Sequence, residues 1–358
     1  MKYIDAVDYK LELGNLESSS FNQLLEKYAL NKKVIIVDEN THEHCLPFLI
    51  TTFEELSKAE VILLPPGEEN KQMEIAFHVW EALTEYEVSR SDLIINLGGG
   101  MMTDMGGFIA SCYKRGLDFV HIPTSLLGMV DASIGGKTGV NLGHFKNQIG
   151  VFSNPIAVFI DPKFLSTLPE NELYSGYAEM LKHAFISSES LLERIIDQMK
   201  NKEEYSIDLI HDCILVKNDI VKRDPLENGE RKILNFGHTI GHVVEGYYMD
   251  SLQISHGHSV AIGMVMESFL SMKIGGLSAE KYTEIESLLT SIYPLPKLTD
   301  VGIQKMTAML INDKKNKEGK ILSCLLNKIG ECTYDNAIEE NLFMEVFMHF
   351  KNLQINMN

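Results

Sequence analysis

The chain has 358 residues, of which 45% are hydrophobic and 23% are charged, and its formal net charge is −18. The proportions are those of a globular protein, and the length predicts two domains rather than one core. The acidic balance argues against a nucleic-acid partner, because few cations remain to displace the counterions of a phosphate backbone. A small anionic substrate is still compatible, since a few lysines can form a local positive pocket.

Cysteine use and hydropathy indicate where the protein works. The five cysteines are scattered and lack metal-site spacing, as in proteins of the reduced cytoplasm. The first residues include acidic side chains where a signal peptide needs an apolar run, and no apolar run approaches the ~18 residues that cross a bilayer. We therefore expect a cytoplasmic protein without a membrane partner.

The first half of the chain alternates apolar runs with helical patterns. After a strand or hairpin in the first dozen residues, strands are predicted within 32–40, 61–64, 92–97, 118–122 and 155–162, with helices at 24–30, 72–88 and after 100. Such alternation predicts a parallel sheet with helices on both faces. We assign residues 1–165 to a Rossmann-like α/β dinucleotide-binding domain.

The second half is different, because helical periodicity dominates from about Thr167 onward. Pro294 and Pro296 interrupt this pattern before a final helical stretch. We assign residues 166–358 to an all-α domain that binds metal and substrate. The cleft between two such domains is the expected active site.

Polar residues and glycines follow several predicted strands of the first half. They are Asp38, the segment 67–71, the triple glycine 98–100 and Thr124. Ligands of parallel sheets bind beyond the carboxyl ends of strands, and glycines let backbone N–H groups approach a pyrophosphate. The spacing is not G-x-G-x-x-G, so the glycines could instead only allow tight strand–helix packing. Asp38 could bind a ribose hydroxyl or cap a helix.

The segment Gly128–Gly150 has no strong helix or strand pattern after Ser133, and we expect a long glycine-rich loop there. It carries Asp131, Lys137, Lys146 and Asn147. Lysine supplies a point charge and glycine supplies backbone freedom, so the segment is suited to enclosing an anion.

The histidines of the second half suggest a metal site. His238 and His242 are four residues apart, which places both rings on one helix face, and His256 and His258 follow. Glu179 could add a carboxylate, and two histidines with one carboxylate leave a zinc position open for substrate. The alternatives are an amphipathic helix with two polar-face histidines and a surface ion pair of Glu179 with Lys182.

Several motifs together resemble the 3-dehydroquinate synthase family. They are GGGMMTDMGGFIAS, PTSLLGMVDASIGGKTGVN with KNQIG, GYAEMLKHA, LNFGHTIGH, HGHSVAIGM and DKKNKEGK, and with Asp38 they extend over nearly the whole chain. The resemblance implies tightly held NAD, one divalent metal (zinc, possibly cobalt) and a homodimer. It also implies conversion of the sugar-acid phosphate 3-deoxy-D-arabino-heptulosonate 7-phosphate to 3-dehydroquinate and phosphate, a step of the shikimate pathway to chorismate and aromatic amino acids.

The same resemblance assigns roles to individual residues. The metal ligands would be Glu179, His238 and His256. The NAD contacts would be Asp38, Asn40, Glu68, Lys71, Gly99, Gly100, Asp104, Thr124, Ser125, Leu127, Lys137, Lys146 and Thr167. The catalytic and substrate contacts would be Asp131, Lys137, Asn147, Lys182, Lys217, Arg231, Asn235, His242 and Lys314. Arg115 would reach the neighbouring subunit's site.

Alternative functions remain open from the sequence. A sister cyclase would act on a seven-carbon sugar phosphate without a carboxylate, a metal-dependent polyol dehydrogenase would release NADH, and an inactive homologue would only bind. The family usually has glutamate at the position of His258, which leaves the choice of the third ligand open. Arg231 lies seven residues before His238, roughly two turns back if one helix spans both, and its planar fork is suited to a carboxylate.

Overall fold

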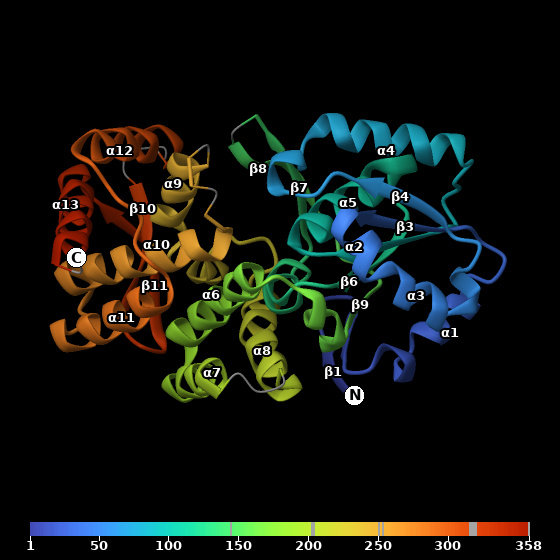
Figure 1. Cartoon of the computed structure of the whole chain (residues 1–358), viewed down its shortest axis with the longest axis horizontal. Helices are drawn as coiled ribbons and strands as arrows, with labels where there is room; N and C mark the ends of the chain where they lie inside the picture. The colour runs from blue at the N-terminus through green and yellow to red at the C-terminus, as the bar shows by residue number, and fades with distance from the viewer. Residues whose placement is uncertain (144, 202–204, 250, 253, 315–320, 357–358) are drawn as a thin grey trace. The chain divides into compact units, whose positions relative to one another are not determined.

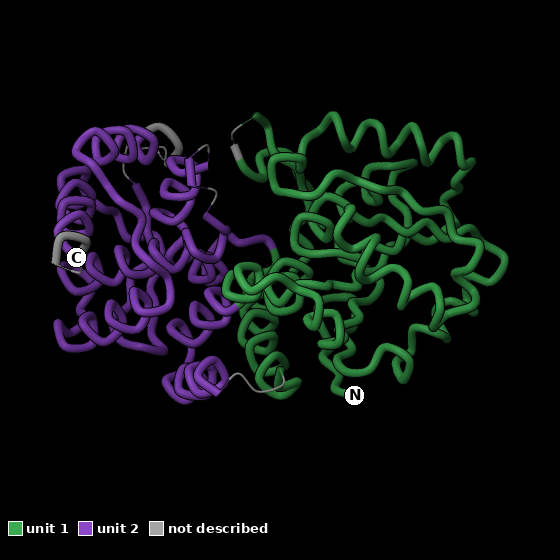
Figure 2. The backbone as a smooth tube through the Cα atoms, viewed as in Figure 1, with its two compact units in different colours: residues 1–176, 204–225 green, residues 177–203, 226–358 purple. Residues whose placement is uncertain are grey.

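The structure is a computed structural model that describes residues 1–143, 145–201, 205–249, 251–252, 254–314 and 321–356. The chain forms two compact units, residues 1–176 with 204–225, and residues 177–203 with 226–358 (Figure 2). These units are regions of dense internal contact, and they need not be the parts of the chain that fold independently. The domain boundary after residue 165 therefore stays a prediction.

The first unit contains a seven-stranded sheet with the order β1-β2-β9-β6-β5-β3-β4 (Figure 1). Its strands are β1 (Lys2–Asp5), β2 (Lys10–Leu13), β3 (Lys33–Asp38), β4 (Glu60–Leu64), β5 (Leu93–Gly98), β6 (Asp118–Pro123) and β9 (Ala157–Ile160). Only the β1–β2 pair is antiparallel, and the others pair in parallel. The predicted parallel sheet is confirmed, and of the strand or hairpin expected in the first dozen residues the structure has the hairpin.

Helices cover both faces of this sheet. On one face, Val34 and Ile36 of β3 share a buried core with Met102 and Met105 of α5 (Gly100–Cys112). On the other face, the ring centroid of Phe21, at the start of α1 (Phe21–Lys27), lies 5.0 Å from that of Phe159 in β9. The other α-helices that lie wholly within the described residues of this unit are α2 (Glu39–His44), α3 (Leu46–Thr52), α4 (Met73–Glu85) and α8 (Ile207–Arg223).

The direction in which the chain adds strands to the sheet reverses between β3 and β5. From β3 the chain continues to β4 on one side and then returns to place β5 on the other side. At such a switch point the loops after the two strands diverge and leave room for a nucleotide. Asp38 ends β3, and Gly98 ends β5, so the predicted cofactor residues flank this point.

The expectation of a loop after Ser133 is wrong, because β7 (Lys137–Leu142) and β8 (Phe145–Phe152) pair as an antiparallel hairpin. Gly139 and Gly150 are directly opposite one another in it. A Cβ atom on Gly150 would lie 2.3 Å from the carbonyl oxygen of Thr138, so glycine is required for the close pairing. Glycine has low strand propensity, so the local sequence pattern did not predict these two strands.

The second unit is helical, as predicted. Its helices are the later part of α6 (Glu170–Ser187), α7 (Glu189–Asn201), α9 (His238–Tyr248), α10 (His256–Leu270), α11 (Ala279–Ile292), α12 (Asp300–Lys314) and α13 (Glu340–Asn356). A two-stranded sheet of β10 (Ile321–Lys328) and β11 (Glu331–Ile338) was not predicted. Within the described residues, every helix is too short or too polar to span a membrane.

Candidate metal and nucleotide sites

Helices α9 and α10 cross in backbone contact. A Cβ atom on Gly263 would lie 1.9 Å from the carbonyl oxygen of Gly237, and one on Gly237 would lie 2.4 Å from Cγ of Met264. Gly237 also has a φ of +84°, which glycine adopts readily. The close crossing matters because His238 begins α9 and His256 begins α10.

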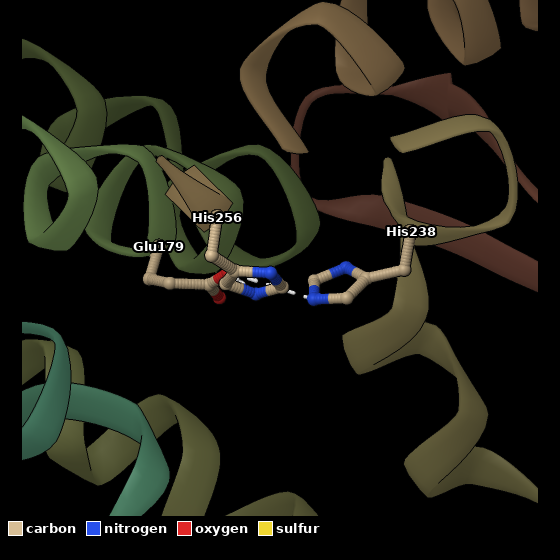
Figure 3. A group of neighbouring side chains, drawn as sticks. All are labelled: Glu179, His238 and His256. Atoms are coloured by element: carbon tan, nitrogen blue, oxygen red, sulfur yellow. Dashed lines mark ion pairs between the residues drawn. The ribbon is translucent and has the colours of Figure 1, made fainter. Parts of the chain in front are cut away.

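Three predicted metal ligands meet in the second unit (Figure 3). Oε1 of Glu179, on α6, lies 3.5 Å from Nε2 of His238 and 3.7 Å from Nε2 of His256. Glu179 is fully buried; its Oε2 forms an ion pair with Lys182, and its Oε1 accepts no hydrogen bond from the residues that the structure describes. A buried carboxylate oxygen without a hydrogen bond is costly, so Oε1, which faces both rings, fits a site completed by a metal cation.

The outer nitrogens of both rings are held by acceptors. Nδ1 of His238 lies 3.3 Å from the carbonyl oxygen of Phe236, and Nδ1 of His256 lies 3.3 Å from Oε2 of Glu245. An Nδ1–H that donates to these oxygens leaves the Nε2 lone pairs directed toward Glu179. This arrangement of imidazole and outer-shell acceptor is the usual one around a bound metal.

The other two histidines have different surroundings. The ring of His242 lies 5.3 Å from that of His238 between centroids, and His242 forms a second set of close ligand atoms with Glu245 and His256. Nε2–H of His258 donates to the carbonyl oxygen of Pro294 at 2.8 Å, and burial lowers the pKa of His258. In the structure His258 is therefore directed to another segment and not to Glu179.

Further predicted substrate residues lie in this unit. Lys182 is buried and forms an ion pair with Glu179, so the surface pair that the sequence left as an alternative is instead an interior one. Arg231 is also buried, at 2% exposure, and Nδ2–H of Asn235 donates to Oε1 of Glu227 at 2.6 Å. The side chain of Lys314 lies outside the described part of the structure.

The possibility that one helix joins Arg231 to His238 is not realised. Residues Glu230–Asn235 form a 3-10 helix, and α9 begins only at His238. Gly237, in the left-handed region, separates the two segments. The helical phase between Arg231 and His238 therefore cannot be read from a spacing of seven residues.

In the first unit, the glycines after β5 have two roles. A Cβ atom on Gly98 would lie 2.4 Å from Cγ of Met102, so this glycine serves tight strand–helix packing. Gly99 is the N-cap of α5, and a Cβ atom there would approach Oγ of Ser125 at 3.2 Å. Gly99 and Ser125 thus come together at a helix N-terminus, where an anion is favoured.

Asp38 forms the helix cap that the sequence left as one alternative. Its Oδ1 accepts a hydrogen bond from the backbone N–H of Thr41 at 2.8 Å, and its own N–H donates to Oγ1 of Thr41 at 3.0 Å. This capping box begins α2.

Lys71 is a buried cation at the centre of a polar cluster. Its Nζ lies 2.5 Å from Oδ2 of Asp104, 2.6 Å from Oδ1 of Asn147 and 3.7 Å from Oε1 of Glu68. Burial by itself lowers the pKa of Lys71, but the carboxylates of Asp104 and Glu68 outweigh it and raise the pKa. The cluster brings together four residues that the sequence analysis predicted separately.

Asn141 organises this cluster and was missed from the sequence. Its Nδ2–H donates to the backbone oxygen of Glu68 at 3.2 Å and to Oε1 of Glu68 at 3.1 Å. Its Oδ1 accepts from the N–H of Asn147 at 2.9 Å, and its own N–H donates to the backbone oxygen of Lys71 at 2.7 Å. The sequence signal that could have identified Asn141 is an asparagine between the apolar residues Val140 and Leu142.

Asp131 and Lys217 also meet in the first unit. Nζ of Lys217 lies 2.9 Å from Oδ1 of Asp131 and 2.6 Å from its backbone oxygen. Other predicted residues lie in less buried positions of the same unit. They are Asn40, Lys137, Thr167 and Arg115, which are exposed, and Leu127 and Lys146, which are half-buried.

Known protein families match both halves of the chain. A family described as 3-dehydroquinate synthase N-terminal matches residues 61–175, and one described as 3-dehydroquinate synthase C-terminal matches residues 176–316. The 3-dehydroquinate synthase of Parabacteroides distasonis is 38% identical over 332 residues, which cover 91% of this chain and 93% of that protein. That of Clostridium perfringens strain SM101 is 40% identical over 79% of this chain and 81% of its own length.

Solved structures share the fold. The 2-epi-5-epi-valiolone synthase of Streptomyces hygroscopicus, solved with NAD+ and Zn2+ bound, matches with a TM-score of 0.85 and 25% identity, covering 99% of both chains. The NADH-dependent butanol dehydrogenase A of Thermotoga maritima matches with a TM-score of 0.64 and 15% identity, covering 97% of this chain and 98% of that one, which shows a common fold alone. The predicted α/β plus helical fold class is confirmed.

Proposed function

The chain belongs to the 3-dehydroquinate synthase family, and from this premise we propose that it is an enzyme that converts 3-deoxy-D-arabino-heptulosonate 7-phosphate to 3-dehydroquinate and phosphate. One observation of the structure supports this best. The buried Oε1 atom of Glu179 accepts no hydrogen bond from the described residues and faces the Nε2 atoms of His238 and His256, while Oε2 forms an ion pair with Lys182.

The residues present fit a divalent metal. Glu179, His238 and His256 would hold one zinc or cobalt ion and leave a coordination position open for substrate. When bound, the metal and NAD would supply Lewis-acid polarisation of a hydroxyl or ketone and reversible acceptance of a hydride. The solved structure of the related 2-epi-5-epi-valiolone synthase, which contains NAD+ and Zn2+, supports this pair of cofactors.

The nucleotide would bind at the switch point of the sheet. The N-terminus of α5, capped by Gly99, would receive the pyrophosphate through backbone N–H groups. The protonated Lys71 is held by Asp104 and Asn147 in the same unit, where the carboxylates of Asp104 and Glu68 balance its charge. We propose that the remaining predicted residues, including Thr124, Ser125 and Lys146, also contact NAD, because they belong to the family motifs.

The substrate carries a phosphate and a carboxylate, so its site needs more than one cation. Lys137 and Asn147 of the β7–β8 hairpin, and the buried Lys182 and Arg231, are the residues we assign to this task. Arg231 is suited to the carboxylate, because its planar fork can donate two parallel hydrogen bonds. His242, Lys217 and Asp131 complete the set that we propose to act on the substrate.

Phosphate release tests this function directly. Purified enzyme with NAD+ and zinc should release phosphate from the heptulosonate phosphate without net formation of NADH. Stoichiometric NADH would show a polyol dehydrogenase instead. An inactive homologue would release no phosphate at all.

A sister cyclase is the second candidate, because the fold matches a 2-epi-5-epi-valiolone synthase with a TM-score of 0.85. Arg231→Ala separates the two activities. If Arg231 binds the carboxylate, the variant should lose at least roughly tenfold in kcat/KM on the heptulosonate, since charge-assisted pairs contribute about 1.5–3 kcal/mol. It should lose far less on a sugar phosphate without a carboxylate. Equal losses, or better wild-type turnover of that sugar, would favour the sister cyclase.

We also propose a cytoplasmic homodimer. Arg115 is exposed, and Lys114, Arg115 and Gly116 all have positive φ values of 48°, 69° and 110°. Such a turn projects a side chain outward at a conformational cost that surrounding structure must offset. Light scattering of the purified protein should give twice the mass of the chain, and Arg115→Ala should lower activity without unfolding either unit.

A further inference from the structure

Helix α9 begins without a cap of its own. Its N-cap, Gly237, has no side chain, and its first residue is the proposed ligand His238. The first N–H groups of a helix have no partner within the helix and are satisfied by side chains, water or ligands. An Asp or Ser cap on Gly237 itself is excluded, because a Cβ atom there would lie 2.4 Å from Cγ of Met264 and 2.9 Å from the backbone oxygen of Val260.

Glu267, on the neighbouring helix α10, takes the place of the missing cap. Its Oε2 accepts from the N–H of Gly237 at 2.9 Å, and its Oε1 accepts from the N–H of Ile240 at 3.0 Å. Glu267 is fully buried. A single carboxylate therefore holds both sides of the turn on which His238 is placed.

The location of this carboxylate links two proposed ligands. His256 and Glu267 belong to the same helix, so α10 carries one ligand and also the group that fixes the start of the helix carrying the other. Ile240 is two residues after His238 and Gly237 is one before it. A shift of the Glu267 carboxylate would move the His238 backbone relative to His256 and Glu179.

The charge of Glu267 adds an electrostatic effect. A helix N-terminus has a partial positive charge of roughly half an elementary charge, which opposes a cation bound at its first residue. A buried carboxylate hydrogen-bonded to the N-terminal amides offsets that positive end, and its effect is little screened by solvent. Position and charge thus act in the same direction, toward stronger binding of a divalent cation.

We propose that Glu267 is a positioning residue that raises the affinity of the Glu179–His238–His256 site for a divalent metal. The inference rests on the metal site of the proposed function. It concerns a carboxylate that would not touch the metal. Its effect should therefore be partial, whereas loss of a ligand should be complete.

The test is a titration of metal-free full-length protein with Co2+, followed by the visible absorption of the bound ion, alongside thermal unfolding of each variant. Glu267→Gln should weaken Co2+ binding roughly tenfold, since outer-shell partners of metal ligands typically contribute 10–100-fold. Glu267→Asp keeps the charge but reaches less far, so its affinity should lie between those of wild type and Glu267→Gln.

Glu12→Gln is the matched control. Glu12 is also buried, at 6% exposure, and its Oε2 accepts from the N–H of Ser20 at 2.8 Å just before α1 in the first unit. This variant should lose stability by a similar mechanism without changing Co2+ affinity. A role of Glu267 in stability alone would make the two variants alike, with lower melting temperatures and wild-type Co2+ affinity.

Glu179→Gln distinguishes the possible failures. If it leaves Co2+ affinity unchanged, the proposed metal site itself is wrong. If it abolishes binding while Glu267→Gln binds Co2+ as tightly as wild type, the metal site stands and the role of Glu267 is overturned. Should Glu267→Gln not fold, Glu267→Asp decides, because wild-type affinity in that variant contradicts the proposal.

Discussion

Replacing Asn141 with alanine tests whether the cluster around Lys71 is held together from the β7–β8 hairpin. The substitution removes three side-chain hydrogen bonds, two donated to Glu68 and one accepted from Asn147. Net contributions of about 1 kcal/mol per hydrogen bond predict a loss of about 3 kcal/mol in the free energy of unfolding. The backbone bond from Asn141 to Lys71 is kept, so the hairpin should still form.

The functional consequence should be weaker binding of NAD+. Without Asn141, the segment carrying Glu68 and Lys71 is no longer fixed to the hairpin that carries Asn147. We expect at least a roughly tenfold rise in the dissociation constant of NAD+, because each 1.4 kcal/mol of lost binding free energy is a factor of ten. Isothermal titration with NAD+ measures the affinity, and urea unfolding followed by circular dichroism measures the stability.

Asn154→Ala is the control in the same unit. Nδ2–H of Asn154 donates to the backbone oxygen of Val7 at 2.9 Å, and the residue is exposed. This variant should lose at most about 1 kcal/mol and bind NAD+ as the wild type does. If Asn141→Ala loses stability but keeps NAD+ affinity, the cluster is structural and not part of the nucleotide site. If neither quantity changes, the hydrogen bonds of Asn141 make no net contribution and the reasoning fails.

Three further predictions follow from single residues. His256→Ala should abolish metal binding, measured by atomic absorption. His258→Ala should retain the metal, because Nε2–H of His258 donates to the backbone oxygen of Pro294 and not to Glu179. The reverse result would exchange the roles of the two histidines. Burial lowers the pKa of His121 to about 3, so the unfolded chain gains a proton below about pH 6.5 that the folded chain does not. The free energy of unfolding therefore decreases as the pH falls from about 6.5 toward 3, by about 2 kcal/mol at pH 5. His121→Asn should remove this part of the pH dependence, measured by urea titrations at pH 7 and pH 5. An unchanged pH dependence would contradict the burial argument. Gly99→Ala should change the melting temperature little, because the φ of Gly99 is an ordinary −74°. It should weaken NAD+ binding, because the added methyl group would lie 3.2 Å from Oγ of Ser125 at the proposed pyrophosphate site. Wild-type NAD+ affinity in this variant would exclude Gly99 from the nucleotide site.

Local pattern was sufficient wherever one element determines its own structure. Apolar runs such as 92–97 predict buried strands, and their alternation with helices predicts a parallel sheet, because these signals depend on neighbours in the sequence. The same holds for the carboxyl-end positions of Asp38 and Gly99. The same signals did not predict the glycine-rich hairpin of β7 and β8, because its strands depend on the close approach of Gly139 to Gly150 and not on side-chain propensity.

The candidate metal site shows where local pattern stops. The spacing of His238 and His242 by itself determined that both rings lie on one face of a helix, and family motifs added Glu179 and His256. Only the tertiary structure decided which atoms meet. The contact of Gly237 with Gly263 sets the crossing of α9 and α10, and with it the facing Nε2 atoms of His238 and His256.

The roles of Asn141 and Glu267 were likewise decided in three dimensions. Asn141 bonds to Glu68, 73 positions away in the chain, and Glu267 accepts from the N–H of Gly237, 30 positions away, at the start of α9. A hydrogen bond between distant segments leaves no periodic signal in the sequence, because its geometry depends on how whole elements pack. The amino-acid sequence therefore determined the elements, their order and the chemical types available, whereas packing determined which of these groups share a site.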